Sequence, residues 1–383
     1  MSVLIVGASA AGLSTLEALR RQGYQEPITV LGAETHLPYD RPPLSKQYLC
    51  GDWDEVRTRL RPEEMLTKLG AEFVLGDPAV ALDVDRRMVS TESGRELSAD
   101  SIVIATGLRA RRLPGQEGLA GVHVLRTLGD ADALRRDLVG SPRMVVVGDG
   151  VLGAEIAATA RKLGCSVTMA GPQAAPLESQ FGPVVAGLLA ELHLAEGVDL
   201  RLGTAVSGLT SANGRVTGVQ LANGETLPAE VVVVALGAIP ATEWLQDSGL
   251  RLDNGVVCDA QCRAAAGIYA AGDVARWQHD GLDALLRLEN RTNATEQAAC
   301  VAANILGENR CYTPIPYFWT DQFATKIQVH GIPGADADVT VAEGALDEHR
   351  FVTHYRRDGR TVAVLGWNMP KQTRLHRAHL VQA

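Results

Sequence analysis

One structural unit occurs twice in this chain, and the repeat constrains the fold more than any other feature. The first copy reads "SVLIVGASAAGLSTLEALRRQGY" and then "PITVLGAE"; the second, from residue 143, reads "RMVVVGDGVLGAEIAATARKLGCSVTMAG". In each copy an apolar run of strand length leads into a glycine turn, a helix and a second strand. A strand, a crossover helix and a parallel strand form a βαβ unit, so the repeat predicts an α/β protein with two parallel sheets.

The glycine turns of both copies are typical of dinucleotide-binding sites. Such a turn brings backbone N–H groups and the positive end of a helix dipole to a pyrophosphate. One G-x-G-x-x-G pattern is weak, but two, each after a strand and before a helix, strongly predict two nucleotide sites. The predicted turn residues are Gly7, Ser9 and Gly12 in the first copy and Gly148, Gly150, Leu152 and Gly153 in the second.

Each copy departs from the usual pattern. Ser9 replaces the middle glycine of the first turn, and Asp149 places an acid inside the second. Glu34 follows the second strand of the first copy, where an acid commonly binds ribose hydroxyls, although a solvated turn residue is the alternative. Gly171 stands at the matching place of the second copy, and no arginine replaces the acid there. The choice between NADH and NADPH therefore stays open.

Three further apolar stretches each end near a glycine. They are "SIVIATGLRARRLPG" (101–115), "EVVVVALGAIP" (230–240) and "GIYAAGDVARW" (267–277), and they add candidate site residues at Ala105, Thr106, Gly107, Gly237, Gly272 and Asp273. Asp273 closes its strand, and its carboxylate can accept a hydrogen bond from a ligand hydroxyl or cap a helix. From about residue 313 the pattern changes to alternating runs such as "FVTHYRR", which predict an antiparallel sheet with a terminal helix.

Composition excludes several classes of function. The net charge of −9 argues against nucleic acid as the main partner. No apolar run approaches the ~20 residues of a membrane span, and the N-terminus lacks the basic start of a signal peptide. We therefore expect a cytoplasmic protein without a membrane partner. The six cysteines form no C-x-x-C pair and suggest no metal site, so buried free thiols are the simplest interpretation.

Several short motifs, in this order, carry a resemblance that spans nearly the whole chain. They are "PYDRPPLSK" (38–46), the two glycine turns, "LRTLGDA" (125–131), "YAAGDVA" (269–275), "NATEQ" (293–297) and "PYFWTDQF" (316–323). Together they resemble the FAD-dependent ferredoxin reductases of bacterial oxygenase systems, the family of putidaredoxin reductase and of the biphenyl dioxygenase reductase component. The resemblance implies a fold like that of glutathione reductase, with two Rossmann-like domains and a C-terminal α+β interface domain.

The resemblance implies FAD and NAD(P)H as cofactors and assigns site residues. It implies FAD contacts at Ala11, Arg41, Lys46, Val80, Arg126 and Asp273. Arg41 and Arg126 can neutralise a pyrophosphate, or they can form ordinary surface salt bridges. Lys46 and Glu155 are expected to pair beside the flavin, where hydride arrives from the nicotinamide. We expect this pair to orient the nicotinamide and tune the flavin, because a buried lysine needs a carboxylate partner.

The remaining assignments concern the path of electrons out of the protein. Trp319 is expected to pack by the flavin near the surface, although core packing is the alternative for a lone aromatic. Arg291 occupies a position next to the flavin where relatives more often have an apolar side chain. Cys50 is single, and we expect no catalysis through it. The flavin then passes electrons directly to an outside acceptor, since flavins exchange both one and two electrons.

A small, acidic ferredoxin that binds transiently is the expected acceptor. The tail offers a basic surface for it, with Arg356, Arg357, Arg360, Lys371, Arg374 and Arg377, although a merely solvated basic helix is the alternative. We predict an FAD domain at 1–111 and 239–312, an NAD(P) domain at 112–238 and an interface domain at 313–383, in a monomer or weak homodimer.

The predicted function is ferredoxin–NAD(P)+ reduction for a cytochrome P450 or a Rieske oxygenase. Two other functions stay open. An NAD(P)H oxidase or diaphorase would use oxygen or a quinone as its acceptor, and an NADH-sensing flavin-binding protein would signal through a change of partner. Strong oxygen uptake without a carrier protein would favour the oxidase, whereas a long-lived reduced complex with slow turnover would favour the sensor.

Overall fold

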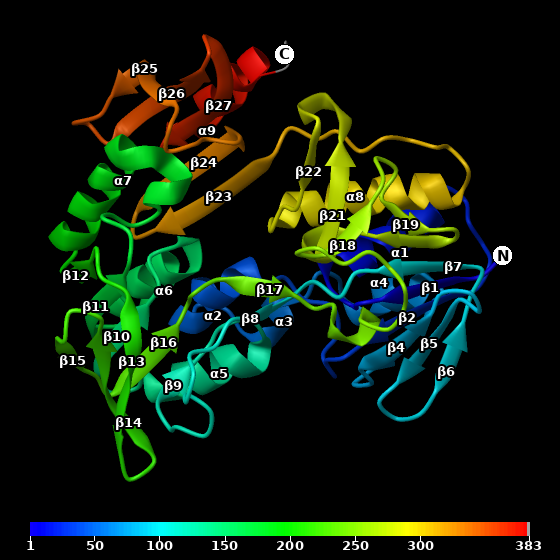
Figure 1. The fold of residues 1–383 in the computed structure, drawn as a ribbon, viewed down its shortest axis with the longest axis horizontal. Coiled ribbons are helices and arrows are strands. Elements are labelled where there is room, and N and C mark those ends of the chain that lie inside the picture. Colours follow the sequence, from blue (N-terminus) through cyan, green and yellow to red (C-terminus); the bar gives the residue numbers. More distant parts are fainter. Residues whose placement is uncertain (381–383) are drawn as a thin grey trace. The chain divides into compact units, whose positions relative to one another are not determined.

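The computed structural model describes residues 1–380 and divides the chain into two compact units (Figure 1). Unit 1 comprises residues 1–40, 58–109 and 239–316, and unit 2 comprises residues 41–57, 110–238 and 317 to the C-terminus. Each unit contains a mainly parallel sheet, one strand of which leads into a glycine turn and a helix. This arrangement confirms the predicted α/β class. None of the helices described is both long and apolar enough to cross a membrane.

The main sheet of unit 1 has six strands in the order β19-β20-β7-β1-β2-β3. These are Arg263–Ala265, Ile268–Ala270, Ser101–Ile104, Val3–Val6, Ile28–Gly32 and Glu72–Leu75. All neighbours are parallel except β19 and β20. Every residue of β1, β7 and β20 is buried, as expected for parallel strands with both faces covered. Helices α1 (Ala10–Arg21) and α8 (Arg291–Ile305) pack against each other in this unit (Figure 1).

Smaller elements complete unit 1. Two three-stranded sheets contain β4 (Ala79–Asp83), β5 (Met88–Thr91) and β6 (Glu96–Ser98), and β18 (Val256–Cys258), β21 (Ala275–His279) and β22 (Ala284–Leu286). The short helices are α4 (Glu63–Lys68), η2 (Glu243–Leu245), η3 (Gly272–Val274) and η4 (Asp280–Leu282), while α3 (Glu55–Thr58) lies where the chain changes unit. The chain also passes between units in β8 (Leu108–Ala110) and β17 (Ala238–Pro240).

The parallel sheet of unit 2 has five strands in the order β12-β11-β10-β16-β9. These are Asp199–Leu202, Ser166–Gly171, Arg143–Val147, Val231–Val234 and Val122–His123. Helices α5 (Leu128–Asp137), α6 (Val151–Lys162) and α7 (Glu178–Ala195) accompany it, with a three-stranded sheet of β13 (Val206–Ala212), β14 (Arg215–Leu221) and β15 (Thr226–Pro228). Helix α6 follows β10 directly and contacts β10 and β11, so this sheet repeats the βαβ arrangement of unit 1.

The tail forms the five-stranded antiparallel sheet that its alternating pattern predicts. The order is β23-β24-β27-β26-β25, with bounds Tyr317–Gln322, Thr325–Gly331, Arg360–Trp367, Arg350–Arg357 and Asp338–Ala345. Helix α9 (Pro370–His376) and the short helix η5 (Arg377–Leu380) end the described chain. Desolvation lowers the pKa of His354 on β26 to about 4, so this imidazole is neutral at neutral pH.

The segment that contains "PPLSK" belongs to unit 2, together with the second glycine turn and the tail. It forms η1 (Pro42–Ser45) and α2 (Gln47–Cys50), and both elements contact α6. Unit 2 therefore gathers three segments that lie far apart in the sequence. The division into three domains remains a prediction.

Candidate active site

The first glycine turn holds two backbone segments too close for any side chain. Gly7 has a φ of 124°, and a Cβ there would lie 2.1 Å from the carbonyl oxygen of Ala105. A Cβ at Gly12 would lie 1.9 Å from the carbonyl oxygen of Gly7. Ser9 has a φ of −122°, which any residue adopts, so a serine at the middle position causes no backbone strain. The turn thus keeps glycine at the two positions where contact requires it.

The predicted residues of unit 1 follow the carboxyl ends of parallel strands. Gly7, Ser9, Ala11 and Gly12 follow β1, Glu34 follows β2, Ala105, Thr106 and Gly107 follow β7, and Gly272 and Asp273 follow β20. Because these strands are parallel neighbours, their carboxyl ends meet at one edge of the sheet. Nucleotides bind at this edge in open α/β sheets.

A pocket of about 240 Å³ lies at this edge. Its lining includes Gly7, Ala33, Thr106 and Trp244. The Nε1 atom of Trp244 is buried and has no hydrogen-bond partner in the part of the chain that the structure describes. A concave site with a glycine turn and an unsatisfied donor fits part of a bound dinucleotide. No motif selects Trp244, which lies shortly after β17.

Other predicted residues of unit 1 make contacts that explain the motifs. Glu34 accepts a hydrogen bond of 2.5 Å from Tyr39 of "PYDRPPLSK". Arg291 forms an ion pair with Asp40 of the same motif, with a distance of 2.7 Å from Nε to Oδ1. The side-chain oxygen of Gln297, in "NATEQ", accepts a hydrogen bond of 2.8 Å from the backbone N–H of Gly272.

The side chain of Val80, on β4, is 48% exposed. The motifs around the first glycine turn contact one another, whereas Val80 is exposed and its contact with FAD stays a prediction.

The second glycine turn repeats the geometry of the first. Gly148 has a φ of 124°, and a Cβ there would lie 2.3 Å from the carbonyl oxygen of Ala235. A Cβ at Gly153 would lie 2.2 Å from the carbonyl oxygen of Gly148. Gly150 has open space around it, and Leu152 lies half-buried on the first turn of α6. Gly237 lies beyond β16 with a φ of 85°.

Asp149 and Gly171, two separate departures in the sequence, are in contact in the structure. A Cβ at Gly171 would lie 2.3 Å from Oδ2 of Asp149, so any side chain there would collide with this carboxylate. Asp149 is only 6% exposed, and its two carboxylate oxygens accept hydrogen bonds of 2.9 and 2.7 Å from the backbone and side chain of Gln173. A carboxylate therefore lies at the end of β11 after all, but it comes from the glycine turn.

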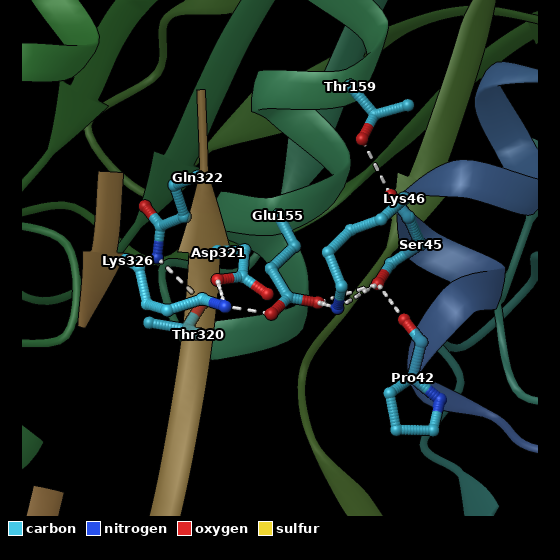
Figure 2. A network of polar contacts seen from close by, with 9 residues as sticks. All are labelled: Pro42, Ser45, Lys46, Glu155, Thr159, Thr320, Asp321, Gln322 and Lys326. Carbon is cyan, nitrogen blue, oxygen red and sulfur yellow. Dashed lines mark hydrogen bonds and ion pairs between the residues drawn. The ribbon is translucent and has the colours of Figure 1, made fainter. Parts of the chain in front are cut away.

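Lys46 and Glu155 form the ion pair that the sequence predicted (Figure 2). Nζ lies 2.6 Å from Oε2, and the two side chains are 12% and 7% exposed. Ser45 donates a hydrogen bond of 2.6 Å to the same oxygen, and Thr320 on β23 donates one of 2.9 Å to Oε1. Glu155 thus has donors on both oxygens, which satisfies a buried charge and fixes its orientation.

A second layer of polar groups supports this pair. Thr159, one turn along α6, donates a hydrogen bond of 2.7 Å to the carbonyl oxygen of Ser45 (Figure 2). Gln322 donates one of 3.1 Å to Thr320, and Oε1 of Gln322 contacts Nε2 of His193 at 2.8 Å. Burial lowers the pKa of His193, so its ring is neutral. We missed Ser45 and Thr320 in the sequence because their partner is far away along the chain.

The other predicted residues and motifs of unit 2 make local contacts. Arg41 donates a hydrogen bond of 2.6 Å to the carbonyl oxygen of Arg126. The "LRTLGDA" motif forms a capping box, in which Thr127 and Asp130 bind each other's backbone N–H at the start of α5. Trp319 is half-buried and stacks on Tyr317 with 6.0 Å between ring centroids. Cys50 ends α2, and all six cysteines are free.

The fold and the site define the class of protein. The family model of pyridine nucleotide-disulphide oxidoreductases matches residues 1–298, and a reductase C-terminal model matches residues 317–383. The chain belongs to the pyridine nucleotide-disulphide oxidoreductase family, whose members use FAD and NAD(P)H, and it is an oxidoreductase. The match of the C-terminal model confirms the predicted C-terminal sheet domain, whereas the predicted domain bounds stay a prediction.

Relatives of known activity narrow the class. The chain is 36% identical over 373 residues to rhodocoxin reductase of Rhodococcus erythropolis, and the aligned region covers 97% of this chain and 87% of the relative. It is 38% identical over 377 residues to the ferredoxin–NAD(+) reductase subunit of the benzene 1,2-dioxygenase system of Pseudomonas putida, covering 96% and 90%. The covalent complex of putidaredoxin reductase with putidaredoxin contains a chain that superposes with a TM-score of 0.94 at 34% identity, covering 99% and 92%. The resemblance drawn from the motifs is confirmed.

Proposed function

We propose that this protein is a ferredoxin–NAD(P)+ reductase, which transfers electrons from a nicotinamide through FAD to a small iron–sulfur protein of an oxygenase system. One observation carries the proposal. The chain has two dinucleotide turns of the same geometry, and all six of its cysteines are free thiols. No C-x-x-C pair accompanies either turn, and relatives of this chain are ferredoxin reductases, so we expect the electrons to leave to an external acceptor.

The residues of unit 1 that would hold FAD lie at the carboxyl edge of its sheet. The glycine turn at Gly7 and Gly12 would place backbone N–H groups against the pyrophosphate, and Glu34 would bind the ribose hydroxyls. Thr106 and Trp244 line the adjoining pocket. FAD, when bound, accepts a hydride and releases electrons one at a time. The protein contributes position and electrostatics rather than a redox-active side chain.

The Lys46–Glu155 pair would position the nicotinamide for hydride transfer. Three donors, from Ser45, Lys46 and Thr320, hold Glu155, so its carboxylate keeps one orientation. A fixed cation and anion at a largely buried site can bind the polar carboxamide of a nicotinamide and align its reacting carbon. The pair needs to accept no proton for this role.

Asp149 would favour NADH over NADPH. Its buried carboxylate lies at the end of β11, where an acid commonly binds the adenosine ribose. The phosphate on the ribose of NADPH would meet this negative charge without an opposing arginine, and like charges at short range repel. We expect kcat/KM for NADH to exceed that for NADPH by a factor of ten or more, or about 1.4 kcal/mol.

The basic tail would receive an acidic ferredoxin in a short-lived complex. Arg356, Arg360, Lys371, Arg374 and Arg377 are all exposed. Within residues 1–380, Arg357 alone of the six predicted cations pairs with an acid, Asp336, at 2.7 Å. Leu375 is 65% exposed among them and offers an apolar contact. Salt would weaken such a complex because exposed charges are screened.

The test is steady-state reduction of a [2Fe–2S] ferredoxin by the purified FAD-loaded protein, with oxygen uptake recorded in parallel. We expect rapid reduction of the cluster with NADH, slower reduction with NADPH and little oxygen uptake. Lys371→Glu with Arg374→Glu should raise KM for the ferredoxin without changing reduction of ferricyanide, a small acceptor that needs no docking surface. Rapid oxygen uptake with a ferredoxin that stays oxidised would instead identify an oxidase.

A further inference from the structure

Three histidines from separate segments of the C-terminal sheet domain meet in the structure. His354 lies on β26, His376 on α9 and His379 on η5. One ring nitrogen of each lies within 4.8 Å of those of the other two. The ring centroids are 5.0 Å apart for His354 and His376, 5.0 Å for His354 and His379, and 5.6 Å for His376 and His379. Nothing in the proposed electron-transfer site uses these side chains.

We propose that these three imidazoles bind one Zn²⁺ ion. Neutral imidazole nitrogens are common zinc ligands at about 2.0–2.1 Å, which places tetrahedral ligand atoms roughly 3.3 Å apart. Nε2 of His354 and Nδ1 of His376 are 2.8 Å apart, so small side-chain rotations suffice to admit the ion. The fourth ligand is a water molecule, since His379 is exposed and leaves that side open.

Glu343 provides a carboxylate of the kind that zinc-binding histidines contact through the ring nitrogen that does not bind the metal. Its Oε2 lies 3.3 Å from Nε2 of His376, and the Nδ1 of the same ring faces His354. A carboxylate on one ring nitrogen fixes the tautomer, so that the other nitrogen presents its lone pair to a metal. The ring of His376 is thus oriented from one side by Glu343 and faces the cluster with the other.

Packing alone explains the meeting of these three histidines less well than metal binding does. Within the described residues, one hydrogen bond links two of the three rings, those of His354 and His376, and His379 approaches both without such a bond. Nearby positive charges partly oppose the binding of a cation. Arg356 helps to lower the pKa of His354, and Arg374 and Arg377 lie on α9 and η5, which carry His376 and His379. Imidazole binds zinc in its neutral form and adds no positive charge, and the Glu343 carboxylate lies beside His376. We therefore expect moderate rather than extreme affinity for zinc.

Zinc binding would fasten the end of the chain to the sheet. The ion would join α9 and η5 to β26, in addition to the packing contacts of α9 with β24 and β27 and of η5 with β27. A ligand that binds only the folded state raises its stability in proportion to the logarithm of its concentration over Kd. Zinc should therefore raise the Tm of the protein, and a chelator should reverse the rise.

The experiment is a calorimetric titration of the full-length, FAD-loaded protein with ZnCl2 after treatment with a chelator. We expect one Zn²⁺ per chain, with affinity about 100-fold lower in His376→Gln and in His379→Gln, and about 10-fold lower in Glu343→Gln. His349→Asn is the matched control, since His349 is exposed, lies outside the cluster and has a φ of 49° that asparagine accepts. This variant should bind zinc as the wild type does.

Cys311→Ser separates the histidine cluster from the exposed thiol, which could bind zinc by itself. This variant should keep the affinity and the rise in Tm. The proposal would be overturned if the wild type showed no saturable binding, or if both histidine variants bound zinc like His349→Asn. Since both substituted histidines are at least partly exposed, these variants are expected to fold, and the retained FAD spectrum checks this. Failure here would leave the reductase assay unaffected.

Discussion

The two glycine turns of this protein share a backbone and differ in their side chains. Gly7 and Gly148 have the same φ of 124°, and each would place a Cβ within 2.3 Å of a carbonyl oxygen on the neighbouring strand segment. Gly12 and Gly153 each lie against the carbonyl oxygen of the first glycine of their own turn. The close approach of strand and helix thus determines which positions must be glycine, whatever nucleotide the turn receives.

The positions of the acids differ between the two turns. In unit 1 Glu34 follows the second strand and the turn carries Ser9, whereas in unit 2 the turn carries Asp149 and the strand ends in Gly171. The space of a side chain at Gly171 is filled by the carboxylate of Asp149. The comparison teaches that a site can keep a carboxylate at a strand end while its residue moves to another segment.

The helices that follow the turns also differ. Two residues after the last glycine, α1 carries Ser14 and α6 carries Glu155. Ser14 lies half-buried, whereas Glu155 is buried and binds Lys46, Ser45 and Thr320. At this position the second helix therefore carries a buried, hydrogen-bonded carboxylate that the first helix lacks.

The largest effects should come from filling the closest contact in either turn. Gly7→Ala and Gly148→Ala each place a methyl group against a carbonyl oxygen at an unfavourable φ, so we expect each to lower the free energy of unfolding by about 4 kcal/mol. Urea denaturation measures this loss. Gly7→Ala should purify with little FAD, whereas Gly148→Ala should retain FAD and bind NADH weakly.

Gly150→Ala is the matched control for these two variants. A Cβ at Gly150 has open space around it, so this variant should unfold within about 1 kcal/mol of the wild type. If Gly148→Ala lost FAD and Gly7→Ala kept it, the assignment of the two turns to the two nucleotides would be reversed.

The next largest effect should come from replacing Glu155 with serine, the residue type at the matching position of the first unit. Glu155→Ser leaves the largely buried Lys46 without a carboxylate, so we expect a loss of about 3 kcal/mol in the free energy of unfolding. Flavin reduction by saturating NADH should slow about 100-fold, because the nicotinamide loses its alignment. Stopped-flow absorbance of the flavin band under anaerobic conditions measures this rate.

The double variant Lys46→Met with Glu155→Leu separates structure from chemistry. An apolar pair of similar size often restores the stability that a broken buried ion pair loses. We therefore expect most of the unfolding free energy to return while flavin reduction stays slow. A normal rate in this variant would show that the ion pair has only a structural role.

A smaller effect should follow from moving the acid of the second unit from the glycine turn to the end of β11, its usual place in such sites. Gly171→Glu alone collides with Asp149, and we expect a loss of about 2 kcal/mol in unfolding free energy with a higher KM for NADH. Adding Asp149→Gly removes the collision, so the double variant should recover at least half of that loss. Unfolding and KM measured on all four proteins give the coupling between the two sites. Additive effects would contradict the contact between these residues.

The sequence predicted the features that depend on local pattern. The apolar runs, the two glycine turns and the alternating tail led to the correct fold class, and their motifs to the correct family. It also led to the Lys46–Glu155 pair, through the resemblance rather than through any periodicity. The assigned contacts of FAD and NAD(P)H stay predictions.

The features that sequence alone missed depend on tertiary contact. Ser45 and Thr320 bind the same carboxylate from segments with no shared pattern, and each hydroxyl looks ordinary in its own strand or turn. Asp149 and Gly171 were noticed as two departures, but only the fold brings them into contact. The histidine cluster likewise takes one member from a strand and two from the chain end.

The smallest effect should come from exchanging the middle residues of the two turns. Ser9 has a φ of −122° and Gly150 one of −85°, so both lie in regions that any residue adopts. The Ser9 side chain makes no capping hydrogen bond, and Gly150 has open space around it. Ser9→Gly and Gly150→Ser should each change the free energy of unfolding by less than about 0.5 kcal/mol.

Binding then shows what the middle residue does for each nucleotide. A serine hydroxyl at position 9 can donate to the pyrophosphate of FAD, so Ser9→Gly should weaken FAD retention a few-fold, at a cost of about 1 kcal/mol. Gly150→Ser adds bulk where a backbone approaches a phosphate and should raise KM for NADH by a similar factor. FAD release measured by fluorescence, and KM for NADH, test the two halves separately. If both exchanges left binding unchanged, the middle position would be neutral in this protein, and the first and last glycines alone would define its nucleotide turns.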